Sequence, residues 1–312
     1  SIIKQPEVNG VCPGSMVKVG GFENKIGTAG ELMNVFHEVR LVREAIQRAG
    51  RPGFVIGEAP AAAVSPFALI AAFSQGYYSR TDTHMPMHLY PGLKFDWERL
   101  ILAAYARQMA IHPITCHMEV RGINVRDAWE AAIADVGGSM AYLSINGAHG
   151  THGAGYSKGL EQDMRYNLQA KTLKNLALTR NGPVCCIGMS GSMGGECTRG
   201  AAYGNAYLSF GEAASGAALV VFSAFFDHDR TAGLAAKMVG EATIAAAGLE
   251  RQEANKILNG IISLIDGLGV FDLGKTFPEC YDVEKAEPTD ENKRVYAEAK
   301  NDLREVGVPF KY

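Results

Sequence analysis

The chain has 312 residues, of which 47% are hydrophobic and 20% are charged, so it is long enough to bury a large core. Its 30 basic and 33 acidic residues give a formal net charge of −3 without a basic stripe, so we expect no nucleic acid and no membrane as a partner. No apolar run reaches membrane-spanning length, the first residues lack a signal pattern and the six cysteines are sparse, so we expect a cytoplasmic protein with reduced thiols.

Taken in chain order, the apolar runs predict an alternation of strands and helices. Runs with β-branched or aromatic members and flanking glycine or proline predict strands at residues 11–20, 54–57, within 81–91, and at 113–120, 140–145, 183–189 and 217–226. Apolar residues at helical spacing predict helices at residues 28–49, 66–74, 96–111, 125–136, 158–180, 231–248 and 250–267. Thr28 is predicted to cap the first helix and Gly50 to end it, and Pro288 with Thr289 announces a terminal surface helix.

This alternation predicts the fold class. Seven strands followed by helices, with polar residues after most strands, favour an α/β protein whose parallel sheet closes as a TIM-type (β/α)8 barrel. We expect the barrel at residues 1–274 and a C-terminal tail and helix, residues 275–312, packed on it. The strand count is one short of eight, so an open doubly wound sheet is the alternative.

The stretch MAYLSINGAHGTHGAGY, at residues 140–156, is the centre of the predicted site. Its apolar half predicts a buried strand, and its glycine-rich half predicts the loop at the carboxyl end of that strand, where α/β folds collect their chemistry. Asn146 and His149 are therefore predicted to bind substrate, and His152 to act as a catalytic residue at the substrate or leaving group. The alternative for His152 is a histidine that only satisfies loop carbonyls.

Several short blocks of the sequence resemble a known family. They are AGRPG at residues 49–53, TDTH at 81–84, CT at 197–198, ASG at 214–216, KMVGEA at 237–242, and GKTFPECYDV at 274–283 with PT at 288–289. Their order over nearly the whole chain resembles the monomethylamine:corrinoid methyltransferase superfamily. Members of that family are longer at the N-terminus and carry a pyrrolysine, whose place falls near Gly57 here, while Met85 stands where an acidic residue is expected. The chain therefore resembles a pyrrolysine-free member.

The resemblance implies a reaction and partners. The barrel would transfer a methyl group from a small N-methyl or O-methyl compound to Co(I) of a separate corrinoid protein, in one-carbon metabolism and as a homo-oligomer. Neutral amines and ethers are poor leaving groups, so the site would need an acid, a Lewis acid or a substrate with a quaternary nitrogen.

Three polar residues after the early strands could serve this chemistry. Glu58 stands beside the special position of the family and is predicted as a general acid, the alternative being an exposed loop carboxylate. Asp82 and His84 match the TDTH block and are predicted as a hydrogen-bonded pair that orients substrate, with His84 catalytic. The alternative for this pair is an Asx turn with a capping histidine.

Zinc is a further candidate cofactor. Cys116, His117 and Glu119 are zinc-ligand types on one predicted strand, but a regular strand sends Cys116 to the opposite face from the other two. A zinc site would therefore recruit ligands from neighbouring strands, among His84, His88, His152 and Cys186. Glu119 is also predicted as a catalytic carboxylate at the barrel mouth. The alternatives for the whole chain are a zinc-dependent barrel enzyme, an O-demethylase or hydrolase, and a non-catalytic barrel partner.

A second glycine-rich segment, at residues 188–198, lacks the Gly-Lys-Ser/Thr of a phosphate loop, which gives a nucleotide site little support. We expect it to shape the mouth where a corrinoid approaches, with Met189 in contact with substrate.

Overall fold

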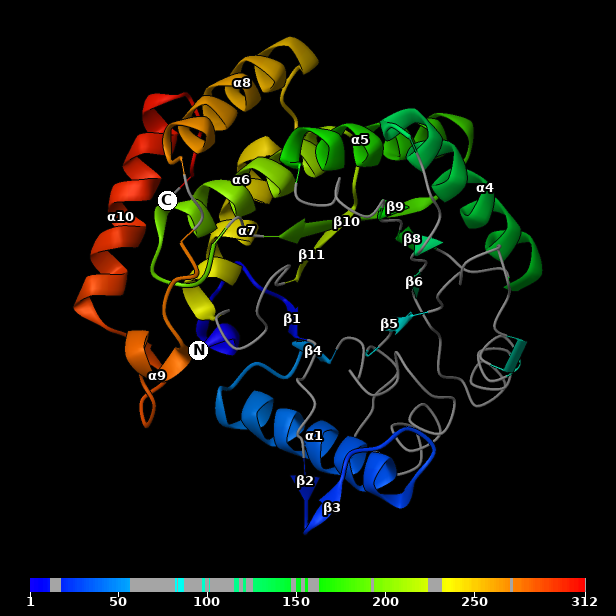
Figure 1. Cartoon of the computed structure of the whole chain (residues 1–312), viewed down its shortest axis with the longest axis vertical. Coiled ribbons are helices and arrows are strands. Elements are labelled where there is room, and N and C mark those ends of the chain that lie inside the picture. The colour runs from blue at the N-terminus through cyan, green and yellow to red at the C-terminus, as the bar shows by residue number, and fades with distance from the viewer. Residues whose placement is uncertain are drawn as a thin grey trace. The chain divides into compact units, whose positions relative to one another are not determined.

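Two compact units make up the chain. The computed structural model describes residues 1–11, 18–56, 82, 84–86, 97–98, 101, 115–117, 120–121, 126–146, 150–152, 155–156, 163–191, 194–223, 232–269 and 272–311 (Figure 1). The N-terminal unit comprises Asn9–Arg126 and Ile133–Ser157, and the C-terminal unit comprises Ser1–Val8, Asp127–Ala132 and Lys158–Tyr312. Both contain parallel strands and helices, which confirms the α/β class. Closure into a barrel and the domain boundary at Gly274 stay predictions.

Short parallel strands build the N-terminal unit. Its elements are β1 (Gly10–Val11), β2 (Lys18–Val19), β3 (Phe22–Glu23), α1 (Ala29–Arg48), β4 (Val55–Ile56), β5 (His84–Pro86), β6 (Thr115–His117), β7 (Val120–Arg121), β8 (Gly150–His152) and β9 (Gly155–Tyr156). The parallel pairs are β1 with β4, β5 with β6, β6 with β8, and β7 with β9. Parallel neighbours need a long connection between them, which agrees with the spacing of the predicted strands.

Helix α1 begins and ends where the sequence predicts. Thr28 is its N-cap residue, and Gly50 follows the helix with φ +66°, in the left-handed region that glycine adopts without steric cost. Val35, Val39 and Ile46 are buried on one side of the helix, as the helical spacing predicts.

The strand predicted at residues 11–20 is described at its two ends, which belong to different sheets: Val11 lies in β1, which pairs with β4, and Lys18–Val19 form β2. β2 turns back on β3 in an antiparallel hairpin, in which Lys18 is opposite Glu23. The turn is Gly20–Gly21, with φ values of +57° and +86°, and two consecutive positive φ values are what a tight two-residue hairpin requires. The apolar run alone did not reveal this reversal.

Helix α4 (Ala128–Asn146) replaces the central strand predicted at residues 140–145. Its buried positions recur at helical spacing but carry small or polar residues, namely Ala128, Ala131, Ala132, Asp135 and Ser139. The large apolar residues Trp129, Ile133 and Met140 are exposed. The apolar run at residues 140–145 therefore indicates a strand where the burial follows the period of a helix. The alanines of this segment favour the helix, because alanine has the highest helix propensity. Asn146 consequently ends a helix instead of a strand.

Helices dominate the C-terminal unit. Its elements are η1 (Ile2–Lys4), α5 (Met164–Asn181), β10 (Cys185–Gly191), α6 (Arg199–Ala214), β11 (Leu219–Ser223), α7 (Gly233–Ala246), α8 (Arg251–Gly267), α9 (Phe277–Cys280), β12 (Tyr281–Asp282), β13 (Glu287–Pro288) and α10 (Asp290–Glu305). β10 and β11 pair in parallel over five positions, from Ile187 opposite Leu219 to Gly191 opposite Ser223.

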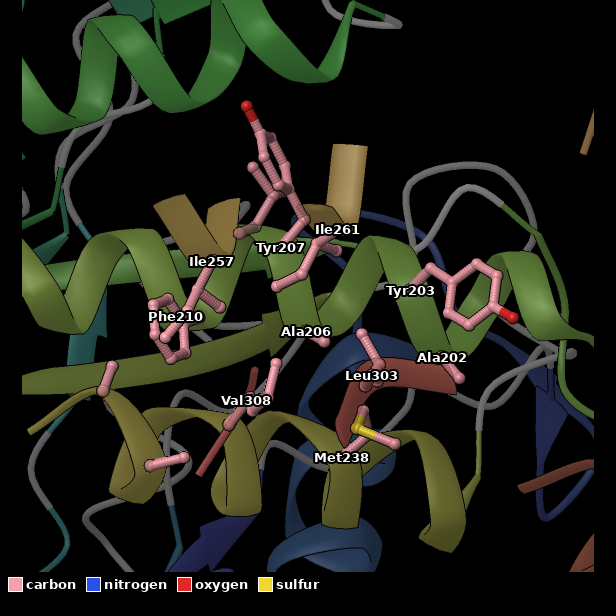
Figure 2. Close-up of a cluster of buried hydrophobic side chains, with 14 of the residues drawn as sticks. Ala202, Tyr203, Ala206, Tyr207, Phe210, Met238, Ile257, Ile261, Leu303 and Val308 are labelled. Carbon is pink, nitrogen blue, oxygen red and sulfur yellow. The ribbon is translucent and has the colours of Figure 1, made fainter. Parts of the chain in front are cut away.

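Helix α6, to which the sequence analysis assigns no element, is the centre of this unit. Every residue from Gly200 to Glu212 is buried. Figure 2 shows its apolar side chains packed with residues of α7, α8 and the end of the chain, and the labelled members are Ala202, Tyr203, Ala206, Tyr207, Phe210, Met238, Ile257, Ile261, Leu303 and Val308. Because all sides of α6 are covered, it shows no amphipathic stripe from which to predict it.

Helix α10 buries one face and exposes the other, so the predicted surface helix is only partly at the surface. Thr289 caps it as predicted, its hydroxyl accepting a hydrogen bond from the Asn292 backbone N–H at 3.3 Å. Ala299 and Leu303 are fully buried against the core around α6, whereas the charged face of the helix is exposed. The tail is therefore an integral part of the core of the C-terminal unit.

Candidate active site

The predicted catalytic histidines, His84 and His152, lie on β5 and β8, the two strands that flank β6 in a parallel sheet of the N-terminal unit. β6 and β8 are neighbouring strands (Figure 1), and His117 and His152, their last residues, are paired in register. Pro86, the last residue of β5, is paired with His117, and His84 lies two positions earlier on β5. Positions two apart on a strand share a face of the sheet. His84, His117 and His152 therefore stand at register positions that share one face of three adjacent strands. His117 and His152 end their strands, whereas His84 is the first residue of β5.

His117 is the member that the sequence analysis undervalues. The sequence presents it only as a candidate zinc ligand, one histidine beside Cys116. Its register opposite His152 is a long-range feature that no local pattern contains.

Asp82 is completely buried, with an exposed fraction of 0%. The Arg43 guanidinium of α1 forms an ion pair with its Oδ2, and the backbone N–H of Ile56 donates to its Oδ1 at 2.7 Å. Asp82 thus ties the start of β5 to α1 and to the end of β4, two residues before Glu58. The Asp82–His84 hydrogen bond stays a prediction.

Arg43 is a second residue that the sequence analysis missed. It follows Val39 by four positions and precedes Ile46 by three, so it interrupts the buried apolar side of α1. A cation at such a position needs a buried anion as a partner. The place of Arg43 in the helical pattern therefore indicates that a buried acidic residue packs against α1.

The remaining predicted site residues are placed only in part. Glu58, Glu119 and His149 lie outside the described residues, Asn146 is the last residue of α4, and Met189 lies in β10 opposite Val221. The site assignments therefore stay predictions. Among the residues that the structure describes, no group of three or more histidine, cysteine or acidic side chains could hold a metal ion.

A small pocket in the C-terminal unit lies beside the segment that follows β10. Its lining residues come from that segment and from α6, α7 and α10, and they include Glu196, Cys197, Leu234, Asn292 and Tyr296. Glu196 is 2% exposed, and burial raises the pKa of its carboxyl group, against hydrogen bonds that act in the opposite direction. The sequence analysis did not single out this residue.

None of the helices within the described ranges has the length and apolarity needed to cross a bilayer.

Comparisons with known proteins identify the family. Residues 1–308 match the family described as monomethylamine methyltransferase MtmB. MtmB of Methanosarcina mazei is 26% identical over 309 residues, which cover 97% of this chain and 67% of that protein, and MtmB2 of Methanosarcina acetivorans is 27% identical over 320 residues, covering 98% and 68%. The crystal structure of Methanosarcina barkeri MtmB and that of a hydroxylamine MtmB complex are both 24% identical, with TM-scores of 0.86 and 0.88 over 99% of this chain and 68% of theirs. The chain therefore belongs to the monomethylamine methyltransferase MtmB family.

Proposed function

We propose that the protein is a corrinoid-dependent methyltransferase, which moves a methyl group from a small methylated compound to Co(I) of a separate corrinoid protein. The observation that carries this proposal is the family match over residues 1–308, which leaves almost none of the chain unaccounted for. The relatives named as monomethylamine methyltransferases align over the same length. Neither a hydrolase nor a non-catalytic partner has comparable support.

The reaction sets the task of the site. The bond between the methyl carbon and nitrogen or oxygen breaks, its electron pair stays with the heteroatom, and the methyl group passes to Co(I). Nitrogen departs readily only when it is positively charged in the substrate, and oxygen only when it receives a proton or a Lewis acid. The residues must therefore keep or place a proton at the heteroatom and align the methyl group with its acceptor.

We assign catalytic roles to His84 and His152, together with Glu58 and Glu119. The shared face of β5, β6 and β8 supports the two histidines and adds His117 to the candidates. The substrate contacts proposed are Asp82, Asn146, His149 and Met189. Asp82 also has a structural task, because its carboxylate is engaged by Arg43 and Ile56.

The methyl donor is proposed to be an N-methyl or O-methyl compound handled without pyrrolysine. Gly57 stands near the special position and Met85 follows TDTH, so this chain lacks two features expected of a monomethylamine site. Monomethylamine is therefore one member of the panel to be tested, beside betaines and methoxyarenes.

The finer architecture is part of the same proposal. TM-scores of 0.86 and 0.88 against MtmB crystal structures support closure of the sheet as a (β/α)8 barrel at residues 1–274, with residues 275–312 as a tail packed on it. A homo-oligomer, a cytoplasmic location and a bound zinc ion stay predictions. Light scattering tests the first of these, and metal analysis of the purified protein tests the last.

The experiment mixes the protein with a Co(I) corrinoid protein and each donor, and follows the absorbance of the methyl-Co(III) product. His152→Asn is expected to lower the rate by about 100-fold or more, because a group that handles a proton at the leaving atom contributes on that order. The matched control is His37→Asn on α1, where the ring contacts exposed Arg40. Equal rates for the two variants would remove His152 from the site.

A further inference from the structure

Three segments of the C-terminal unit meet at the carboxylate of Glu196, five residues after β10. The Tyr281 hydroxyl donates to Oε1 at 2.9 Å, and the Asn292 side-chain amide donates to the same oxygen at 3.2 Å. The backbone N–H of Ala232 donates to Oε2 at 3.1 Å. These four residues, Glu196, Ala232, Tyr281 and Asn292, are called the Glu196 clamp below.

The partners of Glu196 are themselves held in place. Leu234 donates its backbone N–H to the Tyr281 hydroxyl at 2.7 Å, and the Tyr281 ring stacks on Phe277 with centroids 4.8 Å apart and planes 8° from parallel. The hydroxyl therefore accepts from the first turn of α7 and donates to Glu196, so its proton has a fixed direction.

The backbone around Glu196 is tied to the same tail. Gly195 donates its N–H to the carbonyl of Asp272 at 3.2 Å, and Lys275 donates its N–H to the carbonyl of Glu196 at 3.0 Å. Gly274 has φ +68°, and a Cβ there would lie 2.5 Å from the carbonyl carbon of Gly195. Only glycine permits this approach of two backbones.

The clamp joins the GKTFPECYDV segment of this chain, residues 274–283, to the segment after β10. Tyr281 belongs to this segment and Asn292 to the first turn of α10 after PT, and both donate to Glu196, the residue before the CT block at 197–198. Cys197 has φ +66°, a conformation that costs a non-glycine residue free energy and persists only where its surroundings impose it. These blocks therefore hold one short segment in an unfavourable conformation.

A buried carboxylate is a costly way to stabilise a fold. Taking its charge out of water opposes folding, and apolar residues of similar volume often stabilise as well or better. Glu196 accepts from the backbone N–H of Ala232, the N-cap residue of α7, and its negative charge faces the N-terminus of that helix, which has no capping side chain of its own. Glu196 thereby fixes the backbone of residues 194–198, immediately before α6.

We propose that Glu196 is a positioning residue for methyl transfer, which fixes the segment after β10 by tying it to α7 and to the C-terminal tail. The inference rests on the proposed function, because that function places the reacting groups at the carboxyl ends of strands such as β10. Glu196 acts through the segment at residues 194–198 and does not itself meet the methyl group.

The first measurement is amide hydrogen exchange in the full-length protein. Glu196→Gln keeps the size of the side chain and its acceptor for Tyr281, but it turns an NH2 group toward the N–H of Ala232. Exchange is expected to rise at Ala232 and at residues 195–198 by about tenfold or more, because opening then costs less. Tyr281→Phe removes the hydroxyl alone and is expected to raise exchange in the same segment. Glu305→Gln, at the exposed end of α10, is the control and should leave this exchange unchanged.

The second measurement is the rate of methyl transfer with the same variants. Glu196→Gln and Tyr281→Phe are expected to lower kcat by between about 10- and 100-fold while the KM for the methyl donor stays nearly constant, since a small misplacement reduces the reaction more than binding. Circular dichroism confirms that both variants are folded at the assay temperature.

The outcomes separate this inference from the proposed function. Unchanged exchange at residues 195–198 in both variants overturns the clamp, and raised exchange with unchanged kcat overturns its role in positioning. A wild-type protein that transfers no methyl group from any donor contradicts the proposed function, and the positioning role falls with it. In that case raised exchange would still establish the clamp as a structural feature.

Discussion

At the scale of single residues, the pair Arg43–Asp82 joins α1 to the strands that carry the predicted site. Asp82 is completely buried, and the Arg43 side chain is 15% exposed. Removing the Arg43 guanidinium would leave the Asp82 carboxylate buried without this cation. The loss of stability is larger than when both charges are replaced together.

Arg43→Met is therefore expected to lower the free energy of unfolding by about 3 kcal/mol. The double variant Arg43→Met, Asp82→Asn should recover part of this loss, because the buried charge is then gone. Denaturant unfolding measures both, with Arg48→Met at an exposed position on α1 as the control. A loss no larger than that of the control would show that the ion pair is not important for stability.

The raised pKa of Glu196 predicts that the stability of the protein depends on pH. Burial raises the pKa of Glu196, so the folded state favours the protonated carboxyl group. This contribution is fully present below the pKa of an unfolded glutamate, about 4.3, and is lost as the pH rises through the raised value. The stability of the wild type relative to Glu196→Gln, which cannot titrate, should therefore fall as the pH rises above this value.

Denaturant or thermal unfolding of the wild type and of Glu196→Gln, from about pH 4.3 upward, measures the difference in their free energies of unfolding. The neighbouring thiols titrate later, because burial raises the pKa of Cys197 and raises that of Cys280 to about 12. A difference between the two proteins that is independent of pH would contradict the assignment.

At the scale of elements, the sequence was informative where local chemistry decides the structure. Gly50 ends α1 and Thr289 caps the start of α10, because caps act on the residues beside them. Thr28 stands at the N-cap position of α1 as predicted, but its hydroxyl donates to the carbonyl of Lys25 and makes no capping hydrogen bond. α4 and α6 were misread or missed because their buried faces depend on neighbours distant in the chain. Small residues such as Ala131 and Ser139 are buried on α4, and the polar residues Asn205 and Glu212 are buried on α6.

Gly137 provides a direct test of α4. It is exposed in the interior of the helix, and a Cβ there would meet no atom within 4 Å. Gly137→Ala is expected to raise the free energy of unfolding by about 0.5–1 kcal/mol, since glycine is disfavoured in a helix. Gly50→Ala, at φ +66°, is the contrasting control and should destabilise the protein. A loss of stability for Gly137→Ala would contradict the helical assignment.

At the scale of the whole molecule, the site is a product of contacts that are long in sequence. Asp82 and Arg43 are 39 residues apart, and Glu196 and Asn292 are 96 apart. The sequence predicted a strand within residues 81–91, and the resemblance predicted the family, but His152 was expected in a loop and is the last residue of β8. Its register opposite His117 depends on pairing between two strands. Local patterns contain no such information, so the pairing of His117 with His152 and the contacts of Glu196 could only emerge from the structure.

The central claim is that this chain transfers a methyl group to a corrinoid protein. The most direct measurement follows methyl-Co(III) formation by the wild-type protein, in the presence of a Co(I) corrinoid protein and a panel of methylamines, betaines and methoxyarenes. The account predicts that one donor class gives methyl-Co(III) in an amount equal to the demethylated product, and only when the protein is present. No methyl-Co(III) with any donor would contradict it.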